Sequence, residues 1–340
     1  MLQVAAILMV LMGLLHSQPS MAFGAEGHAF SGAVADRLLN PRAAKQVRRL
    51  LGMRLVEAST WADCVKDVAP GPDGFRHVPD ARFHHSCQAF ETRAGIARMI
   101  DYASRNWSTC GDEARATACH KAYHFADVAI QHDRYDRAFI GTTDHDIVSA
   151  LNAAISVLRG RAPAHPFSIR DKKEALLLLA HLVGDLHQPL HVGAVYFDVN
   201  DHPVDPDHPG RRFDQYSATR GGNSISDGST NLHAEWDAVP VALRPDRIDR
   251  SMLDTAKAVA APRTDIEAWP AAWASETVRS SHTAFDGMTF RRASAKPGQW
   301  EVRFTDRAAY MKLKDDFQKQ QLIRAGARLA QVLNALWPVP

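Results

Sequence analysis

The chain carries little excess charge of either sign. Its 340 residues contain 40 lysines and arginines against 38 aspartates and glutamates, which gives a formal net charge of +2. Proteins that hold nucleic acid through its phosphates alone usually show a strong basic excess. That mode of binding is therefore disfavoured. If the chain handles phosphate groups, something other than lysine and arginine must supply the positive charge.

Cysteine is scarce. There are four cysteines, Cys64, Cys87, Cys110 and Cys119, and no C-x2-C pair that would favour a zinc finger. A small, even number in an exported chain indicates two disulfides. Cys110–Cys119 would close a short loop and leave Cys64–Cys87, but three pairings exist and the sequence does not choose among them.

No apolar run is long enough to span a membrane. The N-terminal run, residues 2–15, is shorter than the roughly 20 residues that a spanning helix needs. No lysine or arginine precedes it, but a polar stretch and the small-residue site Ser20-Met21-Ala22 follow it, as in a secretory signal. We expect a signal peptide at 1–22, one domain at 23–340, and a secreted or periplasmic protein without a membrane anchor. The alternative is a buried N-terminal helix.

Internal repeats, low-complexity tracts and linkers are absent as well, which indicates a single domain. Apolar residues recur at helical spacing along most of the chain, so the expected fold class is all-α. The ranges predicted to be helical are 30–39, 43–51, 59–68, 91–102, 146–158, 171–186, 249–261, 265–279 and 306–336, with a further helix from 232. Residues 70–87 and 192–230 are predicted to be loops, the second with a hairpin, and 286–303 to be extended.

Histidine, in contrast, is abundant, with 17 in the chain. His181 and Asp185 lie four residues apart and therefore project from one face of a helix. The middle of that helix, residues 175–180, is so apolar that we expect it to be buried, where an unpaired carboxylate is costly. Pro189 should end the helix and let His191 turn back toward the same face. A bound metal ion would satisfy these side chains; the alternative for one His-x3-Asp pair is a surface ion pair.

Four further segments carry the same residue types. His233 and Asp237 repeat the spacing of four. Shorter segments are 23–28, which ends in His28, 61–63, which ends in Asp63, and 124–127, which begins with His124. Each of these alone is ordinary, as a helix-start residue or a solvated carboxylate, but the whole set favours metal binding.

In this order the five segments resemble the motifs of the three-zinc nucleases whose prototypes are the fungal single-strand-specific enzymes, relatives of bacterial zinc-dependent phospholipase C. The family pattern is Trp-Gly-x2-Gly-His, Trp-Ala-Asp, His-Phe-x-Asp, His-x3-Asp-x3-Pro-Leu-His and Asn-Leu-His-x2-Trp-Asp. Here the segments are 23–28, 61–63, 124–127, 181–191 and 231–237, with Phe23 in place of the first tryptophan. The resemblance implies a single, mainly helical domain with a zinc cluster at the bottom of a cleft.

Carried over residue by residue, the resemblance implies three zinc ions. The first would be held by Asp63, His124, His181 and Asp185. The second would be held by His191, His233 and Asp237. The third would take His28, Asp185 as a bridge, and the free amine and carbonyl of the mature first residue, Phe23. Signal cleavage would therefore be part of the chemistry.

The resemblance also implies a reaction. Asp63 and Lys66 are expected to be catalytic, with Lys66 near the scissile phosphate. Phe125 would stack on a base while Asp127 bonds to its edge; stacking requires an unstacked base and would explain a preference for single strands. The alternatives are a solvated surface lysine and a core phenylalanine. We expect a secreted zinc-dependent endonuclease that cleaves single-stranded DNA or RNA to 5′-phosphate products, with 3′-nucleotidase activity left open.

Three features depart from the family pattern or remain outside it. The insert 64–123 carries His77, His84, His85 and His120, and is expected to be a disulfide-tied surface lobe or an altered rim of the substrate cleft. His187 should point away from His181 and Asp185, so it is not counted as a ligand. The tract 198–207, with His202, is expected to be a solvated loop rather than a metal site.

Two other functions compete with this interpretation. A zinc-dependent phospholipase C would share the metal frame, but the pair Phe125 and Asp127 and the stretch Gly221-Gly222-Asn223 favour the nuclease. A zinc-scavenging binding protein would use histidine-rich tracts rather than ligands spread over five segments. Nothing in the sequence indicates an obligate protein partner.

Overall fold

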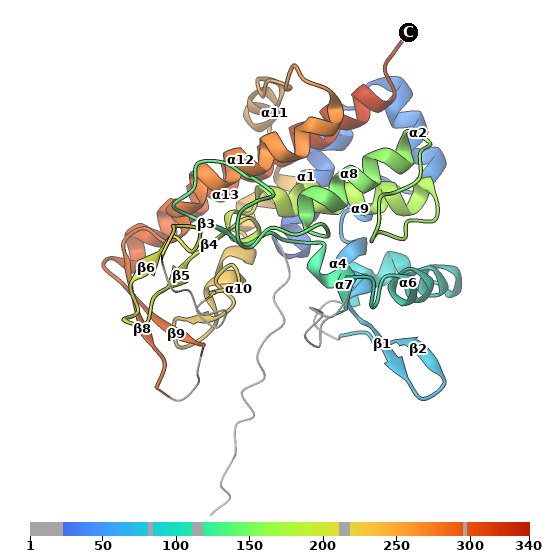
Figure 1. Cartoon of the computed structure of the whole chain (residues 1–340). Coiled ribbons are helices and arrows are strands. Elements are labelled where there is room, and N and C mark those ends of the chain that lie inside the picture. Colours follow the sequence, from blue (N-terminus) through green and yellow to red (C-terminus); the bar gives the residue numbers. More distant parts are fainter. Residues whose placement is uncertain (1–22, 81–83, 111–117, 211–217, 295–297) are drawn as a thin grey trace, which may run out of the picture.

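The computed structural model describes residues 23–80, 84–110, 118–210, 218–294 and 298–340; the expected signal peptide, 1–22, lies outside them. The described chain is a single, mainly helical domain with a few small sheets, as the sequence predicts (Figure 1). None of its described helices combines the length and the apolarity that crossing a membrane requires.

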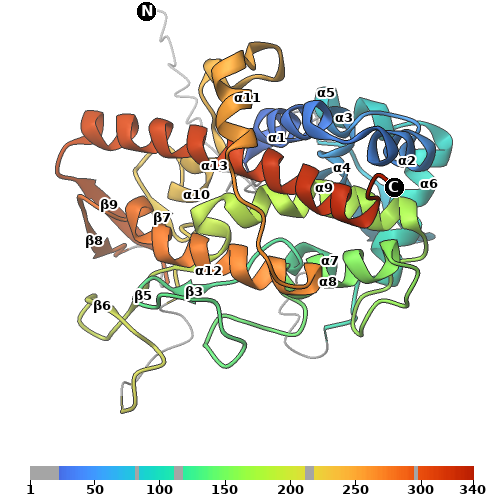
Figure 2. The same ribbon diagram turned by 90° about the horizontal axis from the view of Figure 1, so that it is seen from above.

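The central element is α9 (Lys172–His187), the helix predicted to be buried. Asp171 begins it by accepting a hydrogen bond from the backbone N–H of Glu174, and every residue from Glu174 to His187 is buried. Helix α9 contacts α1 (Gly24–Leu38), α8 (Ile147–Leu158), α12 (Trp269–Ser281) and α13 (Arg307–Leu336). Figure 2 shows it between α1 and α13 on one side and α8 and α12 on the other. The polar side chains from Glu174 onward therefore face protein.

The remaining described helices are all shorter than α9. They are α2 (Pro41–Leu51), α3 (Leu55–Ala58), α4 (Trp61–Val65), α5 (His84–Cys87), α6 (Arg93–Arg105), α7 (Cys119–Ala122), α10 (Leu232–Asp237) and α11 (Arg250–Lys257). Single 3-10 turns lie at Gln88–Phe90, Pro189–His191, Val241–Leu243, Pro245–Arg247, Ile266–Ala268 and His282–Ala284. Asparagine or aspartate side chains cap the N-termini of α2, α8, α10, α11 and α13, which accounts for the sharp helix starts.

The strands of the described ranges form four small sheets. Antiparallel pairs are β1 (Val68–Gly71) with β2 (Gly74–His77) and β5 (Tyr196–Phe197) with β6 (Pro203–Val204). A parallel pair joins β3 (Val128–Ala129) to β4 (Gly193–Ala194). In the fourth sheet, β9 (Trp300–Phe304) lies between β7 (Ile225–Ser226), which is parallel to it, and β8 (Met288–Arg292), which is antiparallel. The prediction of extended structure at 286–303 is confirmed.

Several predicted boundaries were wrong. The helix expected at 59–68 ends at Val65, and the loop expected at 70–87 contains the β1–β2 hairpin and α5. Gly74 has φ 113°, so it supplies the turn conformation that lets the two strands pair. Helix α11 stops at Lys257, before 261, and the helix expected from 265 begins with a 3-10 turn, so that α12 itself starts at Trp269.

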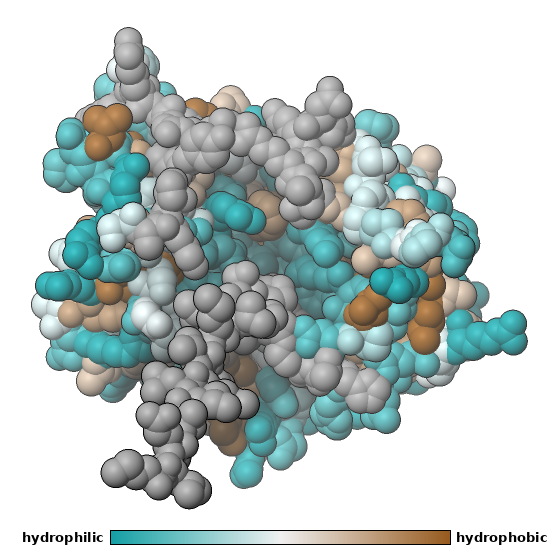
Figure 3. Space-filling view, turned by 90° about the horizontal axis from the view of Figure 1, so that it is seen from below, coloured by the Kyte–Doolittle hydropathy of each residue, from teal (hydrophilic) through white to brown (hydrophobic). Residues whose placement is uncertain are grey.

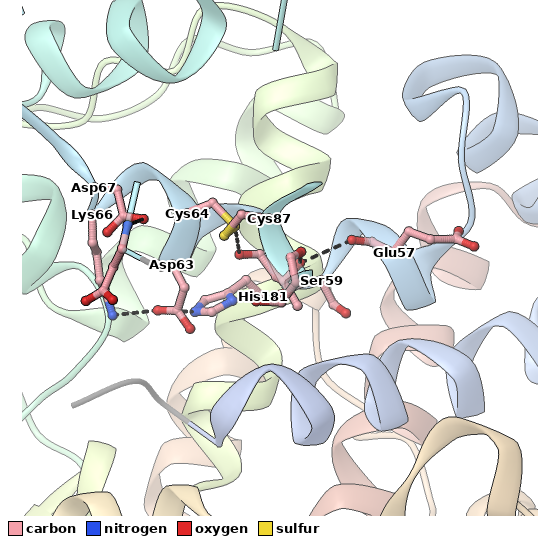
Figure 4. Close-up of a disulfide and its surroundings, with 11 residues drawn as sticks. Glu57, Ser59, Asp63, Cys64, Lys66, Asp67, Cys87 and His181 are labelled. Atoms are coloured by element: carbon pink, nitrogen blue, oxygen red, sulfur yellow. Dashed lines mark hydrogen bonds and ion pairs between the residues drawn. A yellow bond between two sulfur atoms is a disulfide. The ribbon is translucent and has the colours of Figure 1, made fainter. Parts of the chain in front are cut away.

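The cysteines pair as Cys64–Cys87 and Cys110–Cys119, which is the pairing suggested by the short loop. The described part of the insert 64–123 folds as a lobe in which α6 packs on the β1–β2 hairpin, at the right of Figure 1. Cys64 belongs to α4, and Figure 4 shows its disulfide beside Asp63 and Lys66. The disulfide therefore anchors the short helix that carries both side chains.

Candidate metal centre

The structure brings together all eight side chains predicted to bind metal. Their donor atoms form three groups in which every atom lies within 4.8 Å of the others: His28 with His181 and Asp185, Asp63 with His124 and His181, and His191 with His233 and Asp237. All eight are buried. They come from α1, α4, the segment after α7, α9, the 3-10 turn after α9, and α10. Figure 3 shows a hydrophilic depression on the face seen from below, the side toward which α4 and α10 lie in Figure 1.

Asp185 lies where two of the groups meet. Its Oδ1 is 3.1 Å from Nε2 of His28, and its Oδ2 is 2.8 Å from Nδ1 of His124 and 3.1 Å from Nε2 of His181. Burial would raise the pKa of this carboxyl, but His181 and His191 outweigh burial and hold the pKa well below its ordinary value. Asp185 is therefore an anion placed to bridge two cations.

His28 reaches Asp185 because residue 184 has no side chain. The His28 ring stacks on His181 with 3.8 Å between ring centroids. A Cβ atom at Gly184 would lie 2.7 Å from Nδ1 of His28, closer than real contacts allow. The glycine therefore opens the surface of α9 to a ring from α1.

Backbone carbonyls orient three of the imidazoles. Nδ1 of His181 donates to the carbonyl of Ser59, Nδ1 of His191 to that of His124, and Nδ1 of His233 to that of Gly221, each at 2.7 Å. In a neutral imidazole only one nitrogen carries a proton, so a ring that donates from Nδ1 has an unprotonated Nε2 with a free lone pair. Such bonds are typical of metal-binding histidines, because they fix the tautomer and the ring orientation.

The geometry of the second predicted zinc site, His191 with His233 and Asp237, fits a bound metal ion. Nε2 of His191 and Nε2 of His233 lie 3.0 Å apart, and Asp237 Oδ2 lies 3.7 Å from the latter. Burial lowers the pKa of both histidines to about 4, so neither ring carries a second proton at neutral pH. Two lone pairs this close repel each other unless a cation lies between them. Imidazole nitrogen with carboxylate oxygen is a donor set that suits zinc.

The first and third predicted sites contain buried polar atoms with no hydrogen bond. Nδ1 of His28 and Oδ2 of Asp63 have no hydrogen-bond partner, while Nε2 of His28, Oδ1 of Asp63 and Oδ1 of Asp185 have only ion-pair contacts. Leaving several such groups unsatisfied in a protein interior is costly. Metal ions among these atoms would satisfy them.

Lys66 is not a solvated surface lysine. Its Nζ lies 2.7 Å from Oδ1 of Asp63, which is 3.6 Å from Nε2 of His181 (Figure 4). Burial would raise the pKa of Asp63, but Lys66 and the neighbouring histidines outweigh it and lower the pKa to about 2. Burial would likewise lower the pKa of Lys66, yet Asp63 and Asp185 raise it. With one fifth of its side chain exposed, Lys66 is a permanent positive charge at the edge of the centre.

The predicted substrate residues lie beside the centre. The Phe125 side chain is 40% exposed, which excludes its alternative role in the core. Asp127 is half-buried, and burial raises its pKa to about 6, against the opposing effects of Arg220 and the backbone N–H of Gly221. Its backbone is held on both sides, since its N–H donates to the carbonyl of Gly141 at 2.9 Å and Tyr196 donates to its carbonyl.

Phe23, the predicted first residue, is fully buried and packs with Phe30, Val34 and Leu322. The next residue, Gly24, lies against the backbone of Asp237, because a Cβ atom there would be 2.9 Å from the Asp237 carbonyl oxygen. The start of α1 is therefore docked beside a predicted ligand.

Sequence reasoning missed Gln188. Its Nε2 donates to Oδ1 of Asp237 at 3.0 Å, while its Oε1 accepts from the backbone N–H of Leu190. Gln188 stands inside the motif that contains His191, and that position is the only signal that could have revealed it. His187 behaves as predicted: it points away, donates to the carbonyl of Val183, and accepts from Arg328.

We expect Gln188→Leu to weaken metal binding at the His191–His233–Asp237 site by about 10- to 100-fold, as for other residues that orient metal ligands. The measurement is competition for zinc with a chromophoric chelator. Gln331→Leu is the matched control, since Gln331 also donates a hydrogen bond from Nε2, in its case to the partly buried backbone carbonyl of Val259. Equal zinc affinity in the two variants would contradict the assignment.

Comparison with known proteins agrees with this geometry. The S1/P1 Nuclease family matches residues 23–338. A relative is Endonuclease 2 of Arabidopsis thaliana, which is 23% identical over 241 residues. That match covers 68% of this chain and 61% of the relative, so the chain spans less than two thirds of the relative's length. From its family match over nearly the whole chain, we conclude that this protein belongs to the S1/P1 nuclease family.

Proposed function

We propose that this chain is an exported zinc-dependent nuclease that hydrolyses phosphodiester bonds of single-stranded DNA or RNA and leaves 5′-phosphate products. The observation that carries the proposal is the buried centre, above all the unprotonated Nε2 atoms of His191 and His233 at 3.0 Å from each other. Membership of a nuclease family and a relative named Endonuclease 2 support the same activity.

Zinc ions at the centre would supply the Lewis acid that polarises phosphoryl oxygens and lowers the pKa of water. The side chains contribute the rest. Lys66 presents an ammonium to the scissile phosphate while Asp63 holds it in place. The positive charges of the zinc ions and of Lys66 would be concentrated at this centre. This local charge would allow a chain of net charge +2 to act on a polyanion.

Export is proposed from the predicted signal at 1–22 and is supported by the two disulfides, which persist in oxidising compartments.

The proposal is tested by hydrolysis of denatured and native DNA by the protein starting at Phe23, before and after chelation, with zinc counted by elemental analysis. We expect about three zinc ions per chain, faster cleavage of denatured DNA, and loss of activity on chelation. Full activity after chelation would overturn zinc dependence. Zinc without cleavage of any nucleic acid would redirect the assignment to the phospholipase C alternative, testable with short-chain phosphatidylcholine.

Phe125→Ala should lower kcat/KM on single-stranded DNA by about 10- to 100-fold, because stacking contributes roughly 1–3 kcal/mol per base. Rates on a single-stranded substrate are compared with those of Leu313→Ala. Leu313 is 43% exposed, close to the 40% of Phe125, but lies on α13. If the two alanine variants cleave equally fast, Phe125 does not stack on the substrate.

Base preference should change with pH through Asp127, whose pKa is raised to about 6. Below that pH the protonated carboxyl both donates and accepts, which matches the N1 acceptor and N6 donor of adenine. Above it the carboxylate only accepts, which matches the two donors of guanine. We therefore expect the ratio of adenine to guanine cleavage to fall between pH 5 and pH 7.5.

The ratio cancels any effect of pH on the metal centre, which is common to both substrates. Asp127→Asn has a fixed donor and acceptor and should keep a high, pH-independent ratio. A ratio that stays constant in the unsubstituted protein would show that Asp127 does not read the base edge.

A further inference from the structure

A second group of metal-binding side chains lies outside the centre, on two loops. His132 follows β3, whereas Asp205 and Asp207 follow β6. Nε2 of His132 is 2.8 Å from Oδ2 of Asp207 and 3.3 Å from Oδ1 of Asp205. Donor atoms of the three residues lie within 4.8 Å of one another, as in each group of the main centre. Asp205 and Asp207 belong to the tract 198–207, which the sequence predicts to be a solvated loop rather than a metal site.

Neighbouring residues hold the three side chains in position. The His132 ring stacks on Phe139 with 3.7 Å between centroids and 6° between ring planes. Oδ1 of Asp207 accepts from the backbone N–H of Ile140 at 2.8 Å, which leaves Oδ2 facing His132. Oδ1 of Asp205 accepts from the backbone N–H of Asp207. The arrangement is therefore built by contacts from both loops.

Charge in the group is unbalanced. Two carboxylates converge on one imidazole, and across the described ranges no lysine or arginine forms an ion pair with Asp205 or Asp207. A single imidazolium would neutralise only one of them, whereas a divalent cation neutralises both. Nitrogen from imidazole together with carboxylate oxygen favours a transition metal such as zinc over calcium or magnesium, which prefer oxygen alone.

We propose that His132, Asp205 and Asp207 form a further divalent-metal site, separate from the predicted three-zinc centre. Their side chains are 13%, 30% and 16% exposed, so an ion there exchanges with solvent more readily than one in the buried centre. The site ties the loop after β3 to the loop after β6. Ile140, which bonds to Asp207, is followed by Gly141, whose carbonyl holds the backbone N–H of Asp127. The ion therefore braces the loop behind Asp127.

The test compares bound zinc in four proteins, each starting at Phe23 and equilibrated with excess zinc chloride before desalting and elemental analysis. His132→Phe keeps a ring to stack on Phe139 but has no donor. Asp205→Asn/Asp207→Asn keeps carbonyl oxygens for both backbone bonds and removes the charge. His145→Ala is the control, since His145 is also 13% exposed and pairs with one carboxylate, that of Asp144, at 2.7 Å.

We expect the unsubstituted protein and His145→Ala to bind one zinc ion more than the other two variants. Isothermal titration with zinc chloride, after the centre is filled, should show one added site in the unsubstituted protein and in His145→Ala. His132→Phe and Asp205→Asn/Asp207→Asn should lack this site. Equal zinc in all four proteins would overturn the proposal and leave a hydrogen-bonded His–Asp group. If His132→Phe does not fold, the double asparagine variant decides. The result is a difference, so it does not depend on how many ions the main centre holds or on nuclease activity.

Discussion

Asp185→Asn should reduce nuclease activity by about 10³-fold or more, because metal ions supply several kcal/mol of charge stabilisation and each 1.4 kcal/mol corresponds to a factor of ten. The substitution keeps the shape of the side chain. It removes the anion that lies 2.8–3.1 Å from donor atoms of His28, His124 and His181. Zinc content should fall in parallel, and both quantities are measured on the same preparation.

The matched control is Asp286→Asn. His282 and Asp286 have the same spacing of four residues, with 3.3 Å between the pairing atoms, but both side chains are more than half exposed. We expect this variant to keep its zinc and its activity. Normal zinc content and activity in Asp185→Asn would contradict the assignment of Asp185 as the shared ligand.

The second large effect is expected from Gly184→Ala. Alanine stabilises a helix interior by about 1 kcal/mol relative to glycine, so α9 itself should not suffer. The added Cβ would nevertheless lie 2.7 Å from Nδ1 of His28, whose ring is fully buried and stacked on His181 and cannot swing away. We expect the loss of one zinc ion and a fall in activity of about 10- to 100-fold.

His28→Ala tests the cause of that effect. With the ring removed, the Cβ at 184 has nothing to meet, so the double variant His28→Ala/Gly184→Ala should match His28→Ala in zinc content and activity. If Gly184→Ala binds as much zinc as the unsubstituted protein, His28 is not held against α9 as the structure indicates. A double variant much worse than His28→Ala would place the effect of the alanine elsewhere.

Much of the centre could be predicted because its chemistry is local in the chain. His181 and Asp185 share a helical face by spacing alone, and an apolar helix around a carboxylate signals a compensating ligand. The same holds for His233 and Asp237. The β1–β2 hairpin was missed because proline and glycine in 70–77 mark a tight turn between strands as readily as a loop.

Other parts depend on contacts between segments far apart in the sequence. The backbone carbonyls of Ser59, His124 and Gly221 fix the tautomers of three histidines. Because every residue has a backbone carbonyl, the residue types do not reveal this role. Gln188 reaches Asp237 only because the turn after α9 packs beside α10. The group of His132 with Asp205 and Asp207 exists only because the loops after β3 and β6 meet.

The sequence by itself predicted that the fold is helical and that the central helix is buried, since both follow from residue type and periodicity. It also offered the candidate metal ligands, through their residue types and through the resemblance of five segments to the family motifs. Tertiary structure decided how the donors converge. Gly184 admits the ring of His28, and backbone carbonyls turn the Nε2 atoms of His191 and His233 toward each other. The reason is physical. The periodicity of a segment shows which face of that helix or strand is apolar. A distance of 3 Å between two side chains depends instead on how separate helices and strands pack together, and no single segment's pattern encodes that packing.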